Sequence, residues 1–485
     1  MFAYISENGN YRNLYKGQWV ASTHGGSIAV KAPADGKALG TIPSLQRDEI
    51  DLYLQSAKDA QRLWAAKPVN ERASILRKTA QILDENADEI GGILSDEISK
   101  GLSSAVGEVH RTADFIRFTA DQGELAEGRS VGSENFPHFK KDKISVVTRV
   151  PLGVVLAISP FNYPINLAAS KVAPALIAGN SVVLKPPTSG AISGLHLAAA
   201  FKEAGLPDGV LTTVTGRGKE IGDYLVTHPL VDFINFTGSS AVGKHIAEIA
   251  GMVPLLMELG GKDAAIILGD ADLDLAADLI VSGAYGYSGQ RCTAVKRVLA
   301  EDAIADELAG KIVEQIGKLK VGQPRDSADI TPLINAHAAD YVQELIDDAL
   351  EKGAKLLIGN KREGNLIHPT LFDRVTTDMR LAWEEPFGPV LPIIRIRDAD
   401  EGIAISNRSE YGLQGAVFTK DINKAFYVAS RLDVGTVQIN GKPERGPDHF
   451  PFLGVKSSGM GTQGIRYSIE AMSRPKVTVI NFQNF

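Results

Sequence analysis

A single cysteine, Cys292, lies in the segment Gly-Gln-Arg-Cys-Thr at positions 289–293 of this 485-residue chain. Free cysteine packs as a small apolar side chain in many proteins, so the residue alone fits structural burial as well as chemistry. The positive charge of Arg291 favours the thiolate, which is the nucleophilic form of cysteine. Glycines at 283, 286 and 289 indicate an accessible bend and not a helix interior. A nucleophilic thiol is therefore one hypothesis, for which the chain must supply partners.

A second candidate for chemistry lies between Val231 and His245, where a strand-like run leads into Gly238 and Ser239 and a helical pattern follows. Free backbone N–H groups at such a helix start can face an anion. The segment almost matches a phosphate loop, but His245 stands where that loop needs Ser or Thr to hold magnesium. The Gly-x-Gly-x-x-Gly pattern of ordinary dinucleotide sites is absent as well. Two interpretations stay open: an anion site that belongs to neither standard type, or no anion site at all.

The composition is that of a globular chain, with 44% hydrophobic and 22% charged side chains. Its length predicts roughly two to four domains. One cysteine excludes an internal disulfide, and the first ten residues lack the features of a signal peptide. No apolar run approaches the ~20 residues that span a bilayer, and a net charge of −7 argues against a general nucleic-acid surface. We expect a cytoplasmic protein that binds neither membranes nor nucleic acids.

Helical and strand-like patterns alternate along the chain, which predicts an α/β fold with parallel-type sheets in two domains. Helical spacing covers 47–66 and 70–99, and short apolar runs at 153–158 and 181–185 flank a crossover helix at 166–177. The same alternation continues with helices at 190–204, 219–227 and 241–250 and strands at 210–214 and 231–236, and it restarts with strands at 264–268 and 295–300 and helices at 272–285, 304–318 and 337–352.

Two strand-like runs, at 143–149 and 476–482, fit neither α/β domain. Each would present an exposed edge if it stood alone. Pairing across a subunit interface and extension of a local sheet explain the pattern equally well.

Six motifs occur in the order in which the aldehyde dehydrogenase superfamily has them, and the sequence resembles that superfamily over nearly its whole length. Each motif is weak by itself, and the set is specific. They are Ser-Pro-Phe-Asn-Tyr-Pro (159–164), Lys-Pro-Pro-Thr (185–188), Phe-Thr-Gly-Ser (236–239), Met-Glu-Leu-Gly-Gly-Lys (257–262), Gly-Gln-Arg-Cys (289–292) and Glu-Glu-Pro-Phe-Gly-Pro (384–389).

The resemblance implies three structural parts and a homotetramer built as a dimer of dimers. The expected cofactor-binding domain comprises 1–129, 150–258 and 446–465, and the expected catalytic domain comprises 259–445. The remaining segments, 130–149 and 466–485, would form a small β oligomerisation element that includes the two unassigned strands.

The resemblance also implies catalytic roles for Cys292, Asn162 and Glu258. Cys292 would attack an aldehyde carbonyl, and Asn162 would stabilise the oxyanion together with the backbone N–H of Cys292. Glu258 would activate the water that hydrolyses the resulting thioester, and its apolar neighbours predict a raised carboxyl pKa. Taken singly, Asn162 fits a turn residue and Glu258 fits a strand-end residue that reaches solvent.

NADP is the cofactor that the resemblance predicts, with no metal. NAD-preferring relatives often carry a glutamate where Thr188 stands, whereas a hydroxyl can donate to the extra phosphate of NADP. Lys185 and Arg217 would add positive charge. Gly238 and Ser239 would face the pyrophosphate, Glu385 would accept from ribose hydroxyls, and Phe387 would pack near the nicotinamide ring.

Arg111, Tyr163, Arg291 and Arg445 resemble the substrate-phosphate positions of the non-phosphorylating glyceraldehyde-3-phosphate dehydrogenases, one branch of the superfamily. Three converging guanidinium groups would repel one another without an anion between them. The implied reaction oxidises glyceraldehyde 3-phosphate to 3-phosphoglycerate with NADP and water. The alternatives are an NADP-preferring semialdehyde dehydrogenase, such as one for succinic semialdehyde, and a protein that kept the fold without activity.

Overall fold

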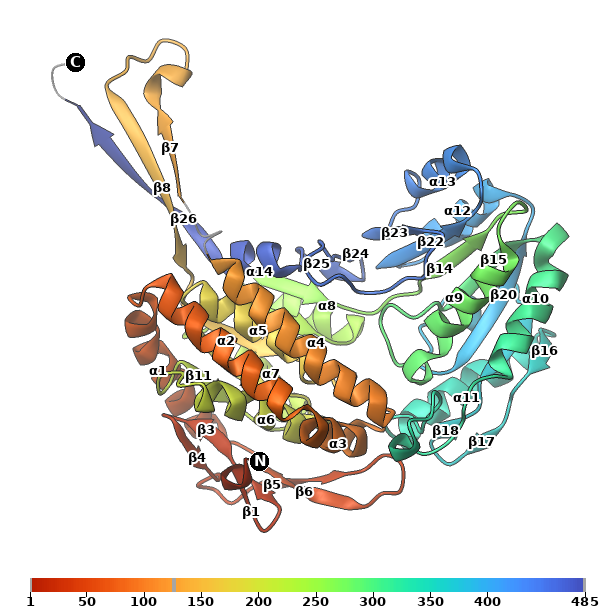
Figure 1. Cartoon of the computed structure of the whole chain (residues 1–485), viewed down its shortest axis with the longest axis horizontal. Helices are drawn as coiled ribbons and strands as arrows, with labels where there is room; N and C mark the ends of the chain where they lie inside the picture. Colours follow the sequence, from red (N-terminus) through yellow and green to blue (C-terminus); the bar gives the residue numbers. More distant parts are fainter. Residues whose placement is uncertain (1, 124–127, 483–485) are drawn as a thin grey trace.

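The computed structural model describes residues 2–123 and 128–482. Two bodies, each built around a parallel sheet, lie beside each other, and a three-stranded arm projects from the first (Figure 1). This arrangement confirms the predicted α/β fold class. Among the described residues, no helix is long and apolar enough to cross a membrane.

The first body contains a six-stranded sheet whose strands run parallel except for the last. Alternate residues of its central strand pack on opposite faces: Val154 and Leu156 belong to one apolar cluster, and Val155 and Ala157 to another. Burial on both faces explains why these strands are continuous apolar runs. In sheet order the strands are β11 (Leu211–Thr213), β10 (Ser181–Lys185), β9 (Val154–Ile158), β12 (Phe233–Thr237), β13 (Leu255–Glu258) and β25 (Gly459–Met460), and the helices between them are α5 (Asn166–Ile177), α6 (Ala191–Glu203), α7 (Gly218–Val226) and α8 (Ser240–Ile249).

The N-terminal part of the chain adds helices and a small sheet to this body. The helix expected over 70–99 is two helices, because the backbone leaves the helical conformation at Asn86, whose side chain caps the Ile82 carbonyl at 2.7 Å. Apolar spacing continues through this break, so the pattern hides it. The elements are β1 (Ser6–Glu7), β2 (Asn10–Tyr11), β3 (Asn13–Tyr15), β4 (Gln18–Val20), β5 (Ser27–Lys31), β6 (Ala38–Pro43), α1 (Arg47–Ala65), α2 (Val69–Glu85), α3 (Ala87–Ile98), α4 (Leu102–Asp121) and, from the C-terminal part, α14 (Ile465–Ala471).

The second body contains a seven-stranded sheet, parallel except at its edge strand β16. Ala264 and Ile266 pack in one apolar cluster and Ala265 and Ile267 in another, so both faces of this sheet are covered too. The strand order is β16 (Lys355–Ile358), β19 (Thr370–Asp373), β20 (Val390–Ile396), β15 (Arg297–Glu301), β14 (Ala264–Ile267), β22 (Gln414–Phe418) and β23 (Thr436–Ile439), with helices α9 (Leu273–Tyr285), α10 (Asp302–Ile316), α11 (Ala336–Glu351), α12 (Ala399–Asn407) and α13 (Ile422–Ala429), and short strand pairs β17 (Arg362–Glu363) with β18 (Leu366–Ile367) and β21 (Tyr411–Gly412) with β24 (Val455–Lys456).

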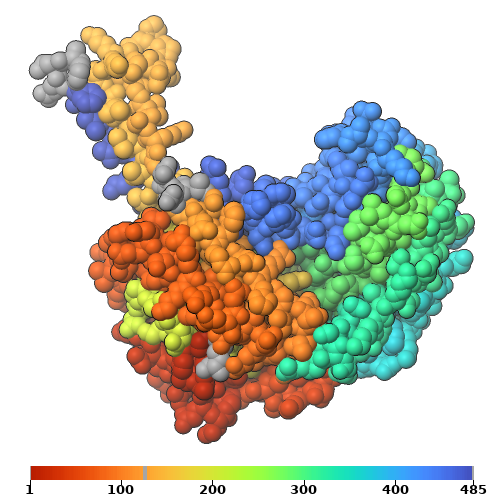
Figure 2. Space-filling view, in the orientation of Figure 1, coloured from red at the N-terminus to blue at the C-terminus, as the bar shows by residue number. Residues whose placement is uncertain are grey.

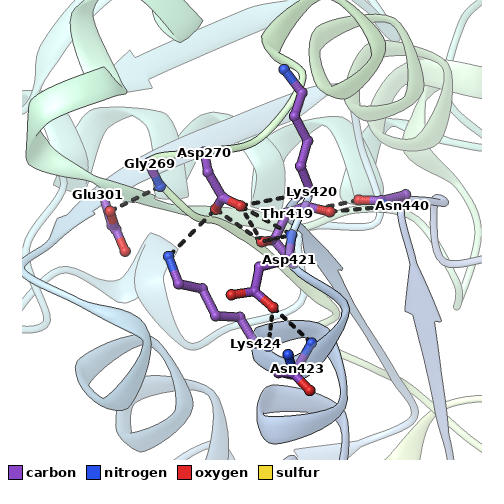
Figure 3. A network of polar contacts seen from close by, with 9 residues as sticks. All are labelled: Gly269, Asp270, Glu301, Thr419, Lys420, Asp421, Asn423, Lys424 and Asn440. Atoms are coloured by element: carbon purple, nitrogen blue, oxygen red, sulfur yellow. Dashed lines mark hydrogen bonds and ion pairs between the residues drawn. The ribbon is translucent and has the colours of Figure 1, made fainter.

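A polar network joins the chain after β14 to the turn between β22 and α13 (Figure 3). The Asp270 carboxylate accepts from the Thr419 hydroxyl at 2.8 Å and from the backbone N–H groups of Lys420 and Asp421 at 3.1 Å. Asp421 in turn caps the start of α13 through the N–H of Asn423. These hydrogen bonds fix the connection between the two segments.

The arm consists of β7 (Arg129–Gly132), β8 (Lys143–Pro151) and β26 (Ser473–Asn481), and Figure 2 shows it standing clear of both bodies. β8 and β26 pair antiparallel from Ser473 opposite Pro151 to Asn481 opposite Lys143. The two strands without assigned partners therefore pair with each other. The predicted domain boundaries stay a prediction, and residues 1, 124–127 and 483–485 of those ranges lie outside the described part.

Candidate active site

A cleft of about 830 Å³ lies at the carboxyl ends of the first sheet, where β9, β10 and β12 end at Ile158, Lys185 and Thr237. This edge of a parallel sheet is the usual ligand site of open α/β folds. The cleft also reaches the second body. Its lining includes the predicted residues Asn162, Lys185, Gly238, Ser239, Cys292, Glu385 and Phe387.

The start of α8 forms one wall of the cleft. Ser239 is the N-cap of this helix, and its hydroxyl accepts from the N–H of Val242 at 3.4 Å. A side chain at Gly238 would place its Cβ 2.4 Å from the Phe236 ring. The glycine therefore permits the tight approach that leads the chain into the helix, and the helix start faces the cleft.

Lys185 supplies a buried cation at the same end of the cleft. Its Nζ donates to the Pro186 carbonyl at 3.2 Å, and burial lowers the pKa of its ammonium to about 8. A buried ammonium with one carbonyl partner is stabilised by an anion. Lys185 and the start of α8 thus fit an anionic cofactor.

Two of the predicted cofactor residues do not line the cleft. Thr188 is half-buried in the loop after β10, and Arg217 is the exposed N-cap of α7, with Glu220 3.8 Å away. The neighbouring Lys219 does line the cleft. It was missed although it belongs to the same basic segment as Arg217.

Glu385 is tied to the loop of the cysteine. Its Oε1 accepts from the Gly261 N–H at 3.1 Å and lies 3.1 Å from the Nζ of Lys296. A Cβ at Gly260 would lie 2.3 Å from Oε2, so a side chain there would make this carboxylate shift. Lys296 also donates to the Cys292 carbonyl. Lys296, four residues after Cys292, was not among the predicted site residues.

Phe387 holds a strained backbone at the cleft. Its φ is 47°, a left-handed conformation that a bulky side chain seldom adopts. Its ring meets Phe161 edge to face at 5.8 Å between centroids. Such strain concentrates at sites that need a fixed side-chain direction.

Cys292 follows the short helix η4 (Gly286–Gly289), within which Tyr287 and Ser288 have a left-handed φ of 53°. The thiol is half-buried at the cleft, which agrees with an accessible bend. Burial raises the pKa of Cys292 to about 11, and Lys296 is the cation that opposes this shift.

Arg291 does not act on the thiol as expected. Its Nη2 donates to the carbonyls of Ser282, at 3.3 Å, and Gly283, near the end of α9. Carbonyls in the last turn of a helix lack partners within the helix and can accept from a guanidinium, and the Gly283 carbonyl accepts from the Val295 N–H as well. The charge that favours the thiolate of Cys292 therefore comes from Lys296.

Asn162 lies in the loop between β9 and α5 and lines the same cleft as Cys292. Its buried Nδ2 donates to the Gln290 carbonyl at 2.9 Å, two residues before the cysteine. An amide nitrogen carries two hydrogens, so one stays available for a ligand. The structure thus brings the predicted oxyanion donor to the loop of the predicted nucleophile.

Glu258 ends β13 with 2% of its surface exposed, so it does not reach solvent. Neither of its carboxylate oxygens has a hydrogen-bond partner among the described residues. Burial raises the pKa of Glu258 to about 8, and the charges of Arg445 and Lys171 oppose the shift. This confirms the raised pKa that the apolar neighbours predicted.

Lys171 is a further buried cation that the sequence analysis missed. It is the only charged residue of α5, and that isolation within an apolar run was the available signal. Its Nζ donates to the Thr237 hydroxyl at 2.7 Å, and burial lowers its pKa to about 7. Lys171 and Glu258 therefore interact in the interior beside Cys292.

The predicted phosphate-binding arginines converge only in part. Arg111, on α4, donates to both Asp448 oxygens, at 2.8 and 2.9 Å, and Arg445 Nε lies 3.6 Å from the same carboxylate. Arg291 lies apart on the α9 carbonyls. Tyr163 packs edge to face on Tyr287 at 6.2 Å. The anion between the two converging arginines is thus an internal one that the sequence analysis missed.

Known proteins match this chain over nearly its whole length. Residues 19–478 match the model of the aldehyde dehydrogenase family. An NADP-dependent glyceraldehyde-3-phosphate dehydrogenase of Streptococcus equinus is 60% identical, over 97% of this chain and 98% of its own length. The pea (Pisum sativum) protein of the same name is 50% identical over 99% of this chain and 97% of its own.

The solved structures agree with the curated relatives. A crystal structure of NADP-dependent glyceraldehyde-3-phosphate dehydrogenase from Bacillus halodurans, complexed with NADP, superposes with a TM-score of 0.97. The two sequences are 54% identical, and the superposition covers 98% of this chain and 100% of the Bacillus halodurans chain.

Proposed function

Because this chain belongs to the aldehyde dehydrogenase family, we propose that it oxidises glyceraldehyde 3-phosphate to 3-phosphoglycerate with NADP and water. One aldehyde, one NADP⁺ and one water give one carboxylate, one NADPH and two protons. The observation that carries the proposal is the 60% identity to an NADP-dependent glyceraldehyde-3-phosphate dehydrogenase over 97% of the chain.

The residues at the cleft fit NADP. Lys185, Lys219 and the start of α8 at Ser239 offer positive charge and free N–H groups to its phosphates. Glu385 and Phe387 line the cleft beside Cys292 and fit the ribose hydroxyls and the ring. When bound, NADP supplies the acceptor for the hydride whose loss turns a thiohemiacetal into a thioester.

Cys292 is the nucleophile of this proposal. Its thiolate sulfur bonds to the aldehyde carbon, and the carbonyl oxygen becomes the oxyanion of a thiohemiacetal. The free hydrogen of the Asn162 amide and the Cys292 backbone N–H donate to that oxyanion. One such donor contributes about 3 kcal/mol to lowering the barrier.

Glu258 completes the cycle as a general base. It takes a proton from water, the water oxygen bonds to the thioester carbon, and the sulfur of Cys292 leaves as thiolate. A carboxyl with a pKa of about 8 is poised near neutral pH to take and release a proton. Its two unpartnered oxygens leave it free to bind that water.

Arg111 and Arg445 bind the substrate phosphate in this proposal, with Tyr163 and Arg291 as further contacts. Two observations support this role. The charge of Arg445 lowers the pKa of Glu258, which places this arginine near the proposed base, and both arginines meet at the carboxylate of Asp448. Guanidinium groups suit phosphate because they donate two parallel hydrogen bonds. Arg291 would have to leave the α9 carbonyls to join them.

The proposal extends to a cytoplasmic homotetramer. The outer strand β26 exposes Val477, Val479 and Ile480 along the arm. Exposed apolar side chains on a projecting sheet are typical of a subunit interface. Sedimentation of the purified chain tests this part separately from activity.

Absorbance of NADPH, measured with the full chain and no inorganic phosphate, tests the reaction. We expect kcat/KM for glyceraldehyde 3-phosphate to exceed that for glyceraldehyde about 100-fold, because two charge-assisted hydrogen bonds contribute roughly 3 kcal/mol. The product should be 3-phosphoglycerate. A preference for succinic semialdehyde, or equal rates with both glyceraldehydes, contradicts the substrate assignment.

A further inference from the structure

Lys100, in the turn between α3 and α4, is buried completely between the two bodies. Its Nζ donates to the backbone carbonyl of Asn162 at 2.8 Å and forms an ion pair with Glu108, and both side chains of the pair have 0% exposure. A buried ion pair contributes little net stability, since both charges lose their water. Its place in the structure is therefore more informative than its strength.

Glu108 extends the contact along the same loop. Its other oxygen accepts from the backbone N–H groups of Ile165 and Asn166, each at 3.2 Å, at the start of α5. A carboxylate at a helix start satisfies N–H groups that have no partner within the helix. Together, Lys100 and Glu108 hold both ends of the segment from Asn162 to Asn166.

Lys100 also contacts the segment that leads to the cysteine. Its ammonium lies 3.5 Å from the centre of the Tyr163 ring and 4.6 Å from that of Tyr287. Tyr287 has the left-handed backbone noted above and donates its hydroxyl to the Ile98 carbonyl at 2.8 Å. Cations are attracted to aromatic faces at these distances, most strongly where water is excluded.

We infer that Lys100 is a positioning residue that fixes the Asn162 amide relative to Cys292. Lys100 contacts the backbone of Asn162 and the ring of Tyr287, which lies in the segment that leads to Cys292. One cation therefore sets the separation between the Asn162 amide and the Cys292 thiol. Asn162 completes the link through Gln290. The inference rests on the proposed aldehyde oxidation, and it holds whichever aldehyde is the substrate.

The test compares three variants. The pair variant combines Lys100→Met with Glu108→Gln and therefore leaves no unpaired buried charge. The second variant is Asn162→Ala, and the third carries all three changes. The rate of the first NADPH burst per active site, with thiols counted by titration, measures formation of the thioester. We expect the pair variant to lose about 100-fold in this rate, since a displacement near 1 Å costs that much. Because Lys100 acts through Asn162, the three changes together should lose no more than Asn162→Ala alone.

Two controls separate positioning from stability and from thiol activation. Arg72→Met removes another buried cation, one that donates to the Ala65 and Lys67 carbonyls, and should lower the melting temperature with an unchanged burst rate. Alkylation of Cys292 by iodoacetamide should stay within twofold of the wild type in the pair variant.

A wild-type burst rate in the pair variant overturns the inference, as do multiplicative losses with Asn162→Ala or a parallel loss of alkylation. Measuring the burst with both glyceraldehyde 3-phosphate and glyceraldehyde keeps the result independent of the substrate assignment. If the wild type shows no preference between them, the proposed substrate fails while the comparison of variants stands.

Discussion

Arg111 donates two hydrogen bonds to the Asp448 carboxylate, from Nε to Oδ2 at 2.8 Å and from Nη2 to Oδ1 at 2.9 Å. Arg445 Nε lies 3.6 Å from Oδ1 of the same carboxylate. The Asp448 side chain is only 14% exposed and that of Arg111 is 41% exposed, so the carboxylate is the more shielded partner. A substrate phosphate that binds between the two arginines must therefore share them with an internal negative charge, or displace it.

Replacing Asp448 by asparagine removes that charge while keeping the shape of the side chain. We expect the KM for glyceraldehyde 3-phosphate to fall about fivefold, because removal of one like charge near the phosphate is worth roughly 1 kcal/mol. The KM for glyceraldehyde should not change. Initial rates at low and high salt measure this. The control is Asp114→Asn, which removes an exposed carboxylate that pairs with Arg117 on α4, the helix of Arg111. A higher KM in Asp448→Asn would show that the carboxylate orients the arginines instead.

Glu258→Gln removes the proposed base and keeps the size of the side chain. Thioester formation should survive, so we expect a burst of about one NADPH per active site followed by a steady rate reduced about 10²- to 10⁴-fold. Stopped-flow absorbance separates the two phases. Loss of the burst itself would assign Glu258 to the first half of the reaction.

The pH dependence of the wild type follows from the same carboxyl. Burial raises its folded pKa to about 8, so the fraction ionised, and with it the hydrolysis rate, should rise as pH increases through 8. In Glu258→Gln this rise should disappear from the steady rate. A steady rate that rises equally in both proteins contradicts the assignment of the titration to Glu258.

Local patterns predicted most of the central fold. The helix Asn166–Ile177 and the strand Ser181–Lys185 begin and end at the predicted residues, because apolar periodicity and the turn at Gly179 mark them within one short stretch. The break at Asn86 has no such local mark.

The site was predictable as far as its motifs reach. Cys292, Asn162, Glu385 and Phe387 belong to short motifs, and the structure brings them to one cleft. The Asp448 carboxylate that binds the predicted arginines was not predictable, because that contact joins distant parts of the chain, whereas Lys296 lies only four residues from Cys292. Arg111 and Asp448 are 337 positions apart, and no local pattern pairs them.

Thr188→Glu tests the choice of cofactor. A carboxylate at this position would repel the extra phosphate of NADP, so we expect kcat/KM with NADP to fall at least about tenfold relative to NAD, or roughly 1.4 kcal/mol. Arg217→Gln is the comparison, because Arg217 is exposed, whereas Thr188 is half-buried, and its guanidinium lies 3.8 Å from Glu220, so it should change the ratio less than threefold. A larger effect of Arg217→Gln would assign the phosphate to the α7 side of the cleft.

Lys296→Met tests which cation favours the thiolate. Burial raises the pKa of Cys292 to about 11 and Lys296 lowers it, so removing this charge should raise the thiol pKa further. The rate of alkylation by iodoacetamide follows the thiolate fraction. We expect its pH profile to move to higher pH, with slower alkylation at any pH below the midpoint. Arg291→Leu should leave the profile unchanged, because that guanidinium faces the α9 carbonyls. The opposite pattern, a shift with Arg291→Leu and none with Lys296→Met, would restore Arg291 as the cation that acts on the thiol.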